Sequence, residues 1–258
     1  MINIKGDGVD TSELGLRIFE LTGFAKDNGA HLQYLTDFEN YRNVVEKYTE
    51  AGAVTGILDN RVSEIGPENG FWVLATSNTG RIIHLQAVRY EYLKGQTLSQ
   101  HWLSDPALYA PAWLDIDFNR SDFDTAPISH EISGAVCYHA DFWLDKEYRN
   151  LELASLLSNY AMVLALARFN PEYFYGFMAP RLVKKGWASR AGYHHTHPWA
   201  PRWYISDKQE FYDEYLVWVT GQDLIDLWSS GKRDTKVLGQ VAQHVDTFPA
   251  VSHAMEGN

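Results

Sequence analysis

The sequence contains only one cysteine, Cys137, among 258 residues. One cysteine cannot form an intramolecular disulfide, so the small disulfide-stapled domains are excluded and a reducing compartment is expected. The first residues, MINIKGDGVDTSEL, have neither the basic start nor the apolar run of a secretory signal. We therefore expect a cytoplasmic protein.

Positive charge is also scarce. Lys and Arg total 22 against 33 Asp and Glu, which gives a formal net charge of −11. Such a field repels nucleic-acid backbones and anionic membrane surfaces, so we expect neither as a partner. The most apolar run, residues 151–169, is too polar for a membrane span. It carries Glu152, Ser155, Ser158, Asn159 and Arg168.

Several catalytic signatures are missing. The sequence has no Walker loop, dinucleotide glycine fingerprint, HExxH pair or Gly-x-Ser-x-Gly elbow. These absences argue against the common kinase, dehydrogenase, zinc protease and serine hydrolase classes. The aromatic content of 14%, with nine Trp and fifteen Tyr, excludes a disordered chain.

The first third of the chain reads as helical. Apolar residues recur at a partly helical period from residue 14 until Gly23, and a capping box over Thr36 and Glu39 opens a second helix. Gly52 is expected to end that helix.

The pattern then becomes β-rich. Residues 71–76 and 81–93 form a predicted hairpin around the turn at residues 77–80. A strand over 132–144, a helix over 150–169 and a strand over 173–178 follow, and this order makes part of the sheet parallel. Further predicted elements are a helix over 181–191, a strand over 212–220 and a helix from 222, before a polar tail of about twenty residues.

The predicted fold is α/β. It has a mixed, mostly antiparallel central sheet with a parallel centre and flanking helices. We expect one structural domain, in which residues 1–66 are a helical elaboration, 67–220 the core, and 221–258 a helix and tail.

Residues 143–157, WLDKEYRNLELASLL, carry the most chemical information. A strand ends, a short turn carries Arg149, and a helix begins at once. The first helical N–H groups lack intrahelical partners and the helix dipole adds partial positive charge there, so a pyrophosphate is a natural ligand.

This segment resembles the acyl-CoA motif of the GCN5-related N-acetyltransferase (GNAT) family, which reads approximately Arg/Gln-x-x-Gly-x-Gly/Ala. Arg149 and Ala154 match the motif, whereas Glu152 stands in place of its middle glycine. Gly192 and Tyr193 resemble the family's Gly-aromatic pair after the next helix. The resemblance implies a GNAT-like core that transfers an acyl group from a thioester to an amine.

The resemblance also implies the binding residues for acyl-CoA, the expected co-substrate. Strand backbone would hold the pantetheine, and the turn with the helix start would hold the pyrophosphate. These residues are Phe142, Trp143, Leu144, Arg149, Asn150, Leu151, Glu152, Leu153 and Ala154.

Two departures from the family pattern leave alternatives open. Glu152 places a carboxylate near the expected phosphates, and Ala188 occupies the position of the family's tyrosine general acid. The donor is therefore acyl-CoA or an acyl carrier protein. The alternative to an enzyme is a catalytically silent binding module with the same fold.

Three residues are candidates for proton transfer. His139 and Asp141 are two positions apart on the predicted strand, so they are expected to share a face with Cys137 and Trp143. Tyr175 on the next strand is a candidate replacement for the missing acid. The competing interpretation is a hydrogen-bonded histidine and a packed tyrosine.

Three further features fall outside this core. The HHTHP segment, residues 194–198, allows an alternative metal-dependent enzyme, although we expect no metal. Arg181, Lys184, Lys185 and Arg190 predict a basic patch. The apolar strand at 212–220 allows a homodimer.

Overall fold

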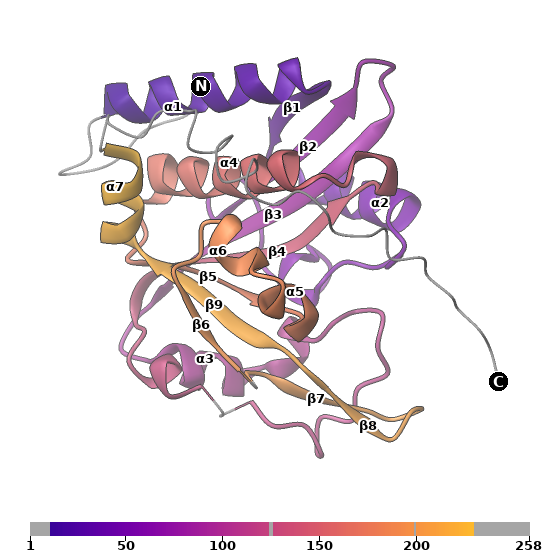
Figure 1. The fold of residues 1–258 in the computed structure, drawn as a ribbon. Helices are drawn as coiled ribbons and strands as arrows, with labels where there is room; N and C mark the ends of the chain where they lie inside the picture. The colour runs from indigo at the N-terminus through magenta and orange to yellow at the C-terminus, as the bar shows by residue number, and fades with distance from the viewer. Residues whose placement is uncertain (1–10, 124–125, 199, 230–258) are drawn as a thin grey trace.

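A computed structural model describes residues 11–123, 126–198 and 200–229 of the chain. Its main sheet has seven strands in the order β1-β2-β3-β4-β5-β9-β6 (Figure 1). The strands are β1 (Ala30–Leu35), β2 (Gly70–Ser77), β3 (Ile82–Leu93), β4 (Gly134–Leu144), β5 (Tyr173–Met178), β6 (His195–His197) and β9 (Tyr215–Thr220). β4 and β5 run parallel and every other neighbouring pair in this sheet is antiparallel. The predicted fold class is confirmed.

Helices cover both faces of the sheet. On one face lie α1 (Thr11–Asp27), α4 (Leu151–Phe169) and α7 (Gly221–Ser229), and Figure 1 shows α1 and α4 side by side there. On the other face lie α2 (Phe38–Tyr48), α3 (Leu98–Ser104) and the short turns η1 (Gly56–Leu58) and η2 (Pro106–Tyr109). We call these the α4 face and the α2 face.

The remaining elements are short. They are η3 (Pro127–His130), η4 (Lys146–Tyr148), α5 (Pro180–Lys184), α6 (Trp187–Arg190) and a hairpin of β7 (Arg202–Ile205) with β8 (Glu210–Asp213). Among the described helices, none has both the length and the apolarity needed to cross a membrane.

Alternation along β2 explains why the sheet has two cores. Phe71, Val73 and Ala75 pack under α1 and α4, while Trp72 and Leu74 pack against the α2 face. Successive side chains of a strand point to opposite faces, so a strand that is apolar at every position must be covered on both sides.

The helical prediction for the first third is wrong at one element. Residues 30–35 form β1, an edge strand that pairs along its whole length with β2. The N-cap of α2 is Asp37 rather than Thr36, and its carboxylate accepts from the amides of Glu39 and Asn40. The side-chain oxygen of an Asx residue serves this role as well as a hydroxyl does.

Two later elements are divided. The helix predicted over 181–191 is broken at Gly186, whose φ of +73° ends α5 before α6 begins. The strand predicted over 212–220 is split into β8 and β9. β9 pairs with β5 on one side and with β6 on the other along residues 216–218. A second copy of the protein therefore has no free strand edge to pair with at these residues. The predicted polar tail lies outside the described residues.

The parallel pairing of β4 and β5 is short. It joins Val136, Cys137 and Tyr138 to residues 173–175, after which both strands continue without pairing to each other. At Gly176 the two backbones still touch, because a Cβ there would lie 2.7 Å from the carbonyl oxygen of His139. The sheet is therefore open between the carboxyl ends of β4 and β5, and we call this the splayed end.

A β-bulge in β4 lies beside this opening. Ala140 pairs with Ala87 and Trp143 with Leu85, so Asp141 and Phe142 together face one residue of β3, Gln86. Asp141 adopts a left-handed backbone with φ of +54°. Bulges of this kind bend a strand and redirect its side chains.

We expect Gly176→Ala to lower the free energy of unfolding by about 1–3 kcal/mol, because the new methyl group must displace backbone rather than a flexible side chain. The matched control is Gly15→Ala in α1, where an added Cβ meets nothing within 4 Å. Helix propensity should leave the control unchanged or more stable by about 1 kcal/mol. Urea denaturation measures both, and equal effects would contradict the close approach of β4 and β5.

Candidate functional site

The bulge at Asp141 separates residues that we expected on one face. Cys137 and His139 lie on the α4 face, where His139 contacts the rings of Phe174 and Tyr193. Asp141 points to the α2 face instead, because the extra residue of the bulge reverses the alternation. Trp143 packs against the α2 face as well. The predicted shared face is thus wrong.

His139 is the centre of a buried hydrogen-bond chain. Its Nδ1 lies 2.8 Å from the Tyr193 hydroxyl and its Nε2 lies 2.9 Å from Oε1 of Gln86. The amide nitrogen of Gln86 donates to the carbonyl oxygen of Leu157 in α4 at 2.6 Å. Since Gln86 presents its oxygen to His139, the histidine donates from Nε2 and accepts the tyrosine proton at Nδ1.

The buried surroundings of His139 keep its imidazole ring neutral. Burial lowers the pKa of His139 to about 3. Burial also raises the pKa of Tyr193 above its ordinary value, so neither group is charged near neutral pH. The hydrogen bonds from Tyr193 to Leu157 link β4, β3, α4 and the segment after α6 at the splayed end.

Asp141 is held by α2 and by the segment that leads into η1. Its carboxylate accepts from the Tyr41 hydroxyl at 3.0 Å, the Thr55 hydroxyl at 2.5 Å and the Thr55 amide at 3.3 Å. Burial raises the pKa of Asp141, while these three donors favour its charged form. Both carboxylate oxygens are occupied.

Tyr175 lies fully buried on the α2 face. It belongs to an aromatic cluster with Trp102, Tyr109, Tyr138 and Phe177. Burial raises the pKa of Tyr175 above its ordinary value. The neutral Tyr175 side chain packs in this cluster, which agrees with the competing interpretation of a packed tyrosine.

The turn between β4 and α4 contains Arg149, which lies close to Glu50. The Nε of Arg149 donates to the carbonyl oxygen of Leu144 at 2.8 Å, and its Nη2 lies 3.7 Å from Oε1 of Glu50. Lys146 approaches the same oxygen at 3.5 Å, and the Trp143 indole donates to the other at 2.5 Å. A hydrogen bond from its own backbone, followed by that from Trp143, lowers the pKa of Glu50.

The first turn of α4 follows directly. Asn150 is the N-cap and accepts from the amide of Leu153 at 2.8 Å, and the Ala154 amide bonds to the Asn150 carbonyl. Leu151 is the first helical residue, and the Glu152 side chain is exposed. By helix geometry the amides of residues 151 and 152 have no partner within the helix.

The last residues of β4 present backbone to the splayed end. The Asp145 amide donates to Ile83 on β3, so alternation turns the amides of Leu144 and Phe142 to the opposite side, where β5 has diverged. The carbonyl of Trp143 accepts from His84 Nδ1 at 2.6 Å. The structure thus brings the nine predicted binding residues, 142–144 and 149–154, to one end of the molecule.

Glu214 is a buried acid that sequence reasoning missed. It directly precedes β9, is 8% exposed and accepts from the Trp203 indole at 2.8 Å. Burial raises its pKa to about 7. The available signal was a glutamate inside the apolar stretch YDEYLVWVT, where a charged residue is costly without a purpose.

The HHTHP segment contributes strand β6. Asp223 of α7 approaches Nδ1 of His194 and Nε2 of His195, both at 3.8 Å, so the fold supplies a carboxylate that sequence spacing did not reveal. Within the described ranges, no three His, Cys, Asp or Glu side chains are grouped so as to hold a metal ion.

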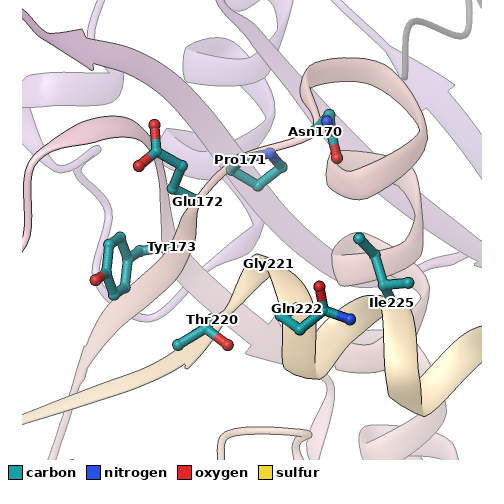
Figure 2. Close-up of a pocket in the computed structure, with 8 residues that line it drawn as sticks. All are labelled: Asn170, Pro171, Glu172, Tyr173, Thr220, Gly221, Gln222 and Ile225. Atoms are coloured by element: carbon teal, nitrogen blue, oxygen red, sulfur yellow. The ribbon is translucent and has the colours of Figure 1, made fainter. Parts of the chain in front are cut away.

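A shallow pocket of about 340 Å³ lies at the opposite end of β5 from the splayed end (Figure 2). It is lined by Asn170, Pro171, Glu172, Tyr173, Thr220, Gly221, Gln222 and Ile225. The Glu172 carboxylate already accepts from the Ala135 amide at 3.2 Å, and the Gly221 amide donates to the Glu172 carbonyl at 2.7 Å. These bonds close the sheet at this end.

The residues of the predicted basic patch lie on and beside α5 and α6. Arg181 and Lys184 of α5 and the following Lys185 are exposed. α6 is tied to α4, because the Ser155 hydroxyl donates to the Arg190 carbonyl and the Ser158 hydroxyl to that of Ala191. These bonds place Arg190 beside the first half of α4.

His84 and His139 are each expected to contribute a loss of stability as the pH decreases from about 6.5, the ordinary pKa of histidine, toward 3. His84 and His139 have lowered pKa values in the fold, so the unfolded chain takes up protons that the folded chain does not. His139→Gln should make this dependence shallower, and should cost about 1–3 kcal/mol at neutral pH by disturbing the buried chain. Denaturation near pH 5 and pH 7.5 measures both effects. Parallel curves for the two proteins would contradict a neutral His139.

Comparisons with known proteins give limited similarity. No protein-family model matches the sequence, and no curated protein matches it. Among solved structures, the chain is similar to Arabidopsis thaliana NAA60 in complex with a bisubstrate analogue, with 11% identity, a TM-score of 0.46, and coverage of 74% of this chain and 97% of that one.

Two other solved structures are similar at the same level. A spermidine N-acetyltransferase SpeG chimera from Vibrio cholerae and hSSAT has 11% identity and a TM-score of 0.45, covering 77% of this chain and 99% of that one. An acetyltransferase of the GNAT family from Streptococcus pneumoniae has 15% identity and a TM-score of 0.40, covering 74% and 99%. Scores this low carry no conclusion about the present chain, whose fold class rests on its own strand pairing.

Proposed function

We propose that the protein is a GNAT-like acyltransferase that moves an acyl group from a thioester to an amine. The observation that carries the proposal is the splayed end, where unpaired strand backbone, Arg149 and the start of α4 meet. The resemblance of residues 147–157 to the family's acyl-CoA motif supports the same assignment independently of this geometry.

In this proposal the acyl donor lies along β4. The amides of Phe142 and Leu144 face the opening, where an extended pantetheine arm can pair with them as a further strand would. The unpaired amides at the start of α4, together with Arg149, provide the attraction for a pyrophosphate. The exposed cations of the basic patch are the proposed contact for an acidic carrier protein.

The reaction requires positioning more than strong chemistry. An amine held near the thioester carbonyl forms the new C–N bond as the C–S bond breaks, and strand amides polarise the carbonyl. Proton transfer by His139, Asp141 and Tyr175 stays a prediction. In the present structure the acceptor nitrogen of His139 is occupied by Tyr193, so His139 must exchange this partner to take a proton, and the Asp141 carboxylate already accepts three hydrogen bonds.

Two departures from the family pattern favour the alternative, a catalytically silent binding module. Ala188 is 3% exposed and packs in the core, so its position offers no acid. The exposed Glu152 and the carboxylate of Glu50 both lie near the expected phosphates, and they repel an anionic donor unless the cations prevail.

We expect Arg149→Ala to weaken acetyl-CoA binding about tenfold, because one charge-assisted contact to phosphate is lost. Glu50→Gln should tighten it several-fold, because the carboxylate no longer competes for Arg149 and Lys146. Isothermal titration calorimetry measures both. Arg120→Ala is the control, since Arg120 lies over the Tyr204 ring, and it should leave the affinity unchanged.

Several results would contradict the acyl-CoA proposal. If neither acetyl-CoA nor longer acyl-CoA thioesters bind the wild-type protein at millimolar concentration, CoA is not the donor. Binding of an acylated carrier protein that is sensitive to Lys184→Ala and Lys185→Ala would then identify the carrier as donor. Tight binding of CoA without thiol release in the presence of any amine would favour the silent module.

A further inference from the structure

Glu214 lies at the splayed end. β9 runs antiparallel to β5, and Tyr215 pairs with Met178, the last residue of β5. Glu214 is one position before Tyr215, so it lies just past the carboxyl end of β5. This is the end where β4 and β5 have separated, because the pairing of these parallel strands stops at Tyr138 and Tyr175.

The side chain of Glu214 belongs to the α2 face. Leu216 and Trp218 follow it at two-residue intervals on that face, whereas Val217 and Val219 pack under α4. Its hydrogen-bond donor, Trp203 of β7, lies in the same α2-face core. The expected donor region at the start of α4 is on the opposite face, so the acceptor of the proposed reaction is assigned to the α2 face.

The surroundings of Glu214 differ from those of Asp141. Within the described part of the chain, its carboxyl group has one hydrogen bond, from the neutral Trp203 indole, and no ion pair. The negative charge of Glu214 helps to raise the pKa of Tyr138 of β4 and of Tyr212 of β8, and Arg181 of α5 acts in the opposite direction on Tyr212. Asp141, by contrast, accepts hydrogen bonds from three donors.

We propose that the Glu214 carboxylate binds the acceptor as a protonated amine and takes its proton before acyl transfer. This inference rests on the proposed function. The ammonium group gives one proton to Glu214, and the neutral amine attacks the thioester carbonyl. The C–N bond forms, the C–S bond breaks, and the thiolate takes the second proton from the new amide nitrogen. Glu214 then releases its proton to solvent.

The acid-base properties of the group fit this role. A base that accepts a proton near neutral pH works best when its pKa lies close to the working pH. Burial, partly offset by the Trp203 hydrogen bond, raises the pKa of Glu214 to about 7. The rate should therefore rise with pH through about 7 as the carboxyl group ionises.

The test measures thiol release from acetyl-CoA with 1,4-diaminobutane and with a glycine-initiated peptide as amine probes, across pH 5–9. We expect Glu214→Gln to lower kcat/KM about 100-fold and to remove the rise near pH 7. Trp203→Phe keeps the carboxylate but loses the bond that favours its charged form, so the rise should move to higher pH. Acetyl-CoA affinity, measured by calorimetry, should stay within twofold in both variants.

A second readout does not depend on turnover. The indole N–H resonance of Trp203 should titrate with a midpoint of about 7 in the wild-type protein and should not titrate in Glu214→Gln. If the wild-type protein is active and Glu214→Gln keeps its rate and pH profile, the role of Glu214 is overturned while the acyltransferase proposal stands. If the wild-type protein neither binds acetyl-CoA nor releases thiol, both proposals are overturned. Should Glu214→Gln fail to fold, an unmoved pH profile in Trp203→Phe overturns the role of Glu214.

Discussion

The early end of the pairing between β4 and β5 is the constraint on which the candidate site depends. Two parallel strands that remained paired would fill each other's backbone groups and leave no opening. Here the bulge at Asp141 bends β4, while Gly176 permits one last close contact before the strands diverge. A non-glycine residue with positive φ costs about 1–3 kcal/mol, and three hydrogen bonds to the Asp141 carboxylate help to hold it in place.

The two faces beside this opening are built differently. On the α4 face, the chain from Tyr193 through His139 and Gln86 to Leu157 fixes four elements with neutral groups whose hydrogen bonds are mutually consistent. On the α2 face lie the carboxyl groups of Asp141, which accepts three hydrogen bonds, and of Glu214, which accepts one. A neutral face suits the placement of a thioester, whereas the buried carboxyl group of Glu214 on the α2 face suits an amine that must lose a proton.

The sequence predicts the central elements well because strong local signals bound them. β5 was predicted at its observed limits, since Asn170 and Pro171 end the preceding helix and an apolar strand follows. β1 was missed because the strand with which it pairs, β2, lies far along the chain. The bulge at Asp141 was invisible, because an argument from alternation assumes a regular strand, and this single extra residue moved Asp141 away from His139. Glu214 was readable as a charge inside an apolar strand, but its burial depends on β7.

Electrostatics distinguishes the two proposed substrates. A chain with a net charge of −11 attracts ammonium groups over roughly a Debye length of about 10 Å and repels phosphates over the same range. An amine acceptor therefore needs no special device to approach a carboxylate on the α2 face. An anionic donor does need one, and the cations at the start of α4 are partly engaged by Glu50. Because Glu50 follows α2 in the chain and also accepts from the Trp143 indole, displacing it from Arg149 would disturb the acceptor face as well. In the proposed arrangement, the donor site and the α2 face are therefore linked through the carboxylate of Glu50.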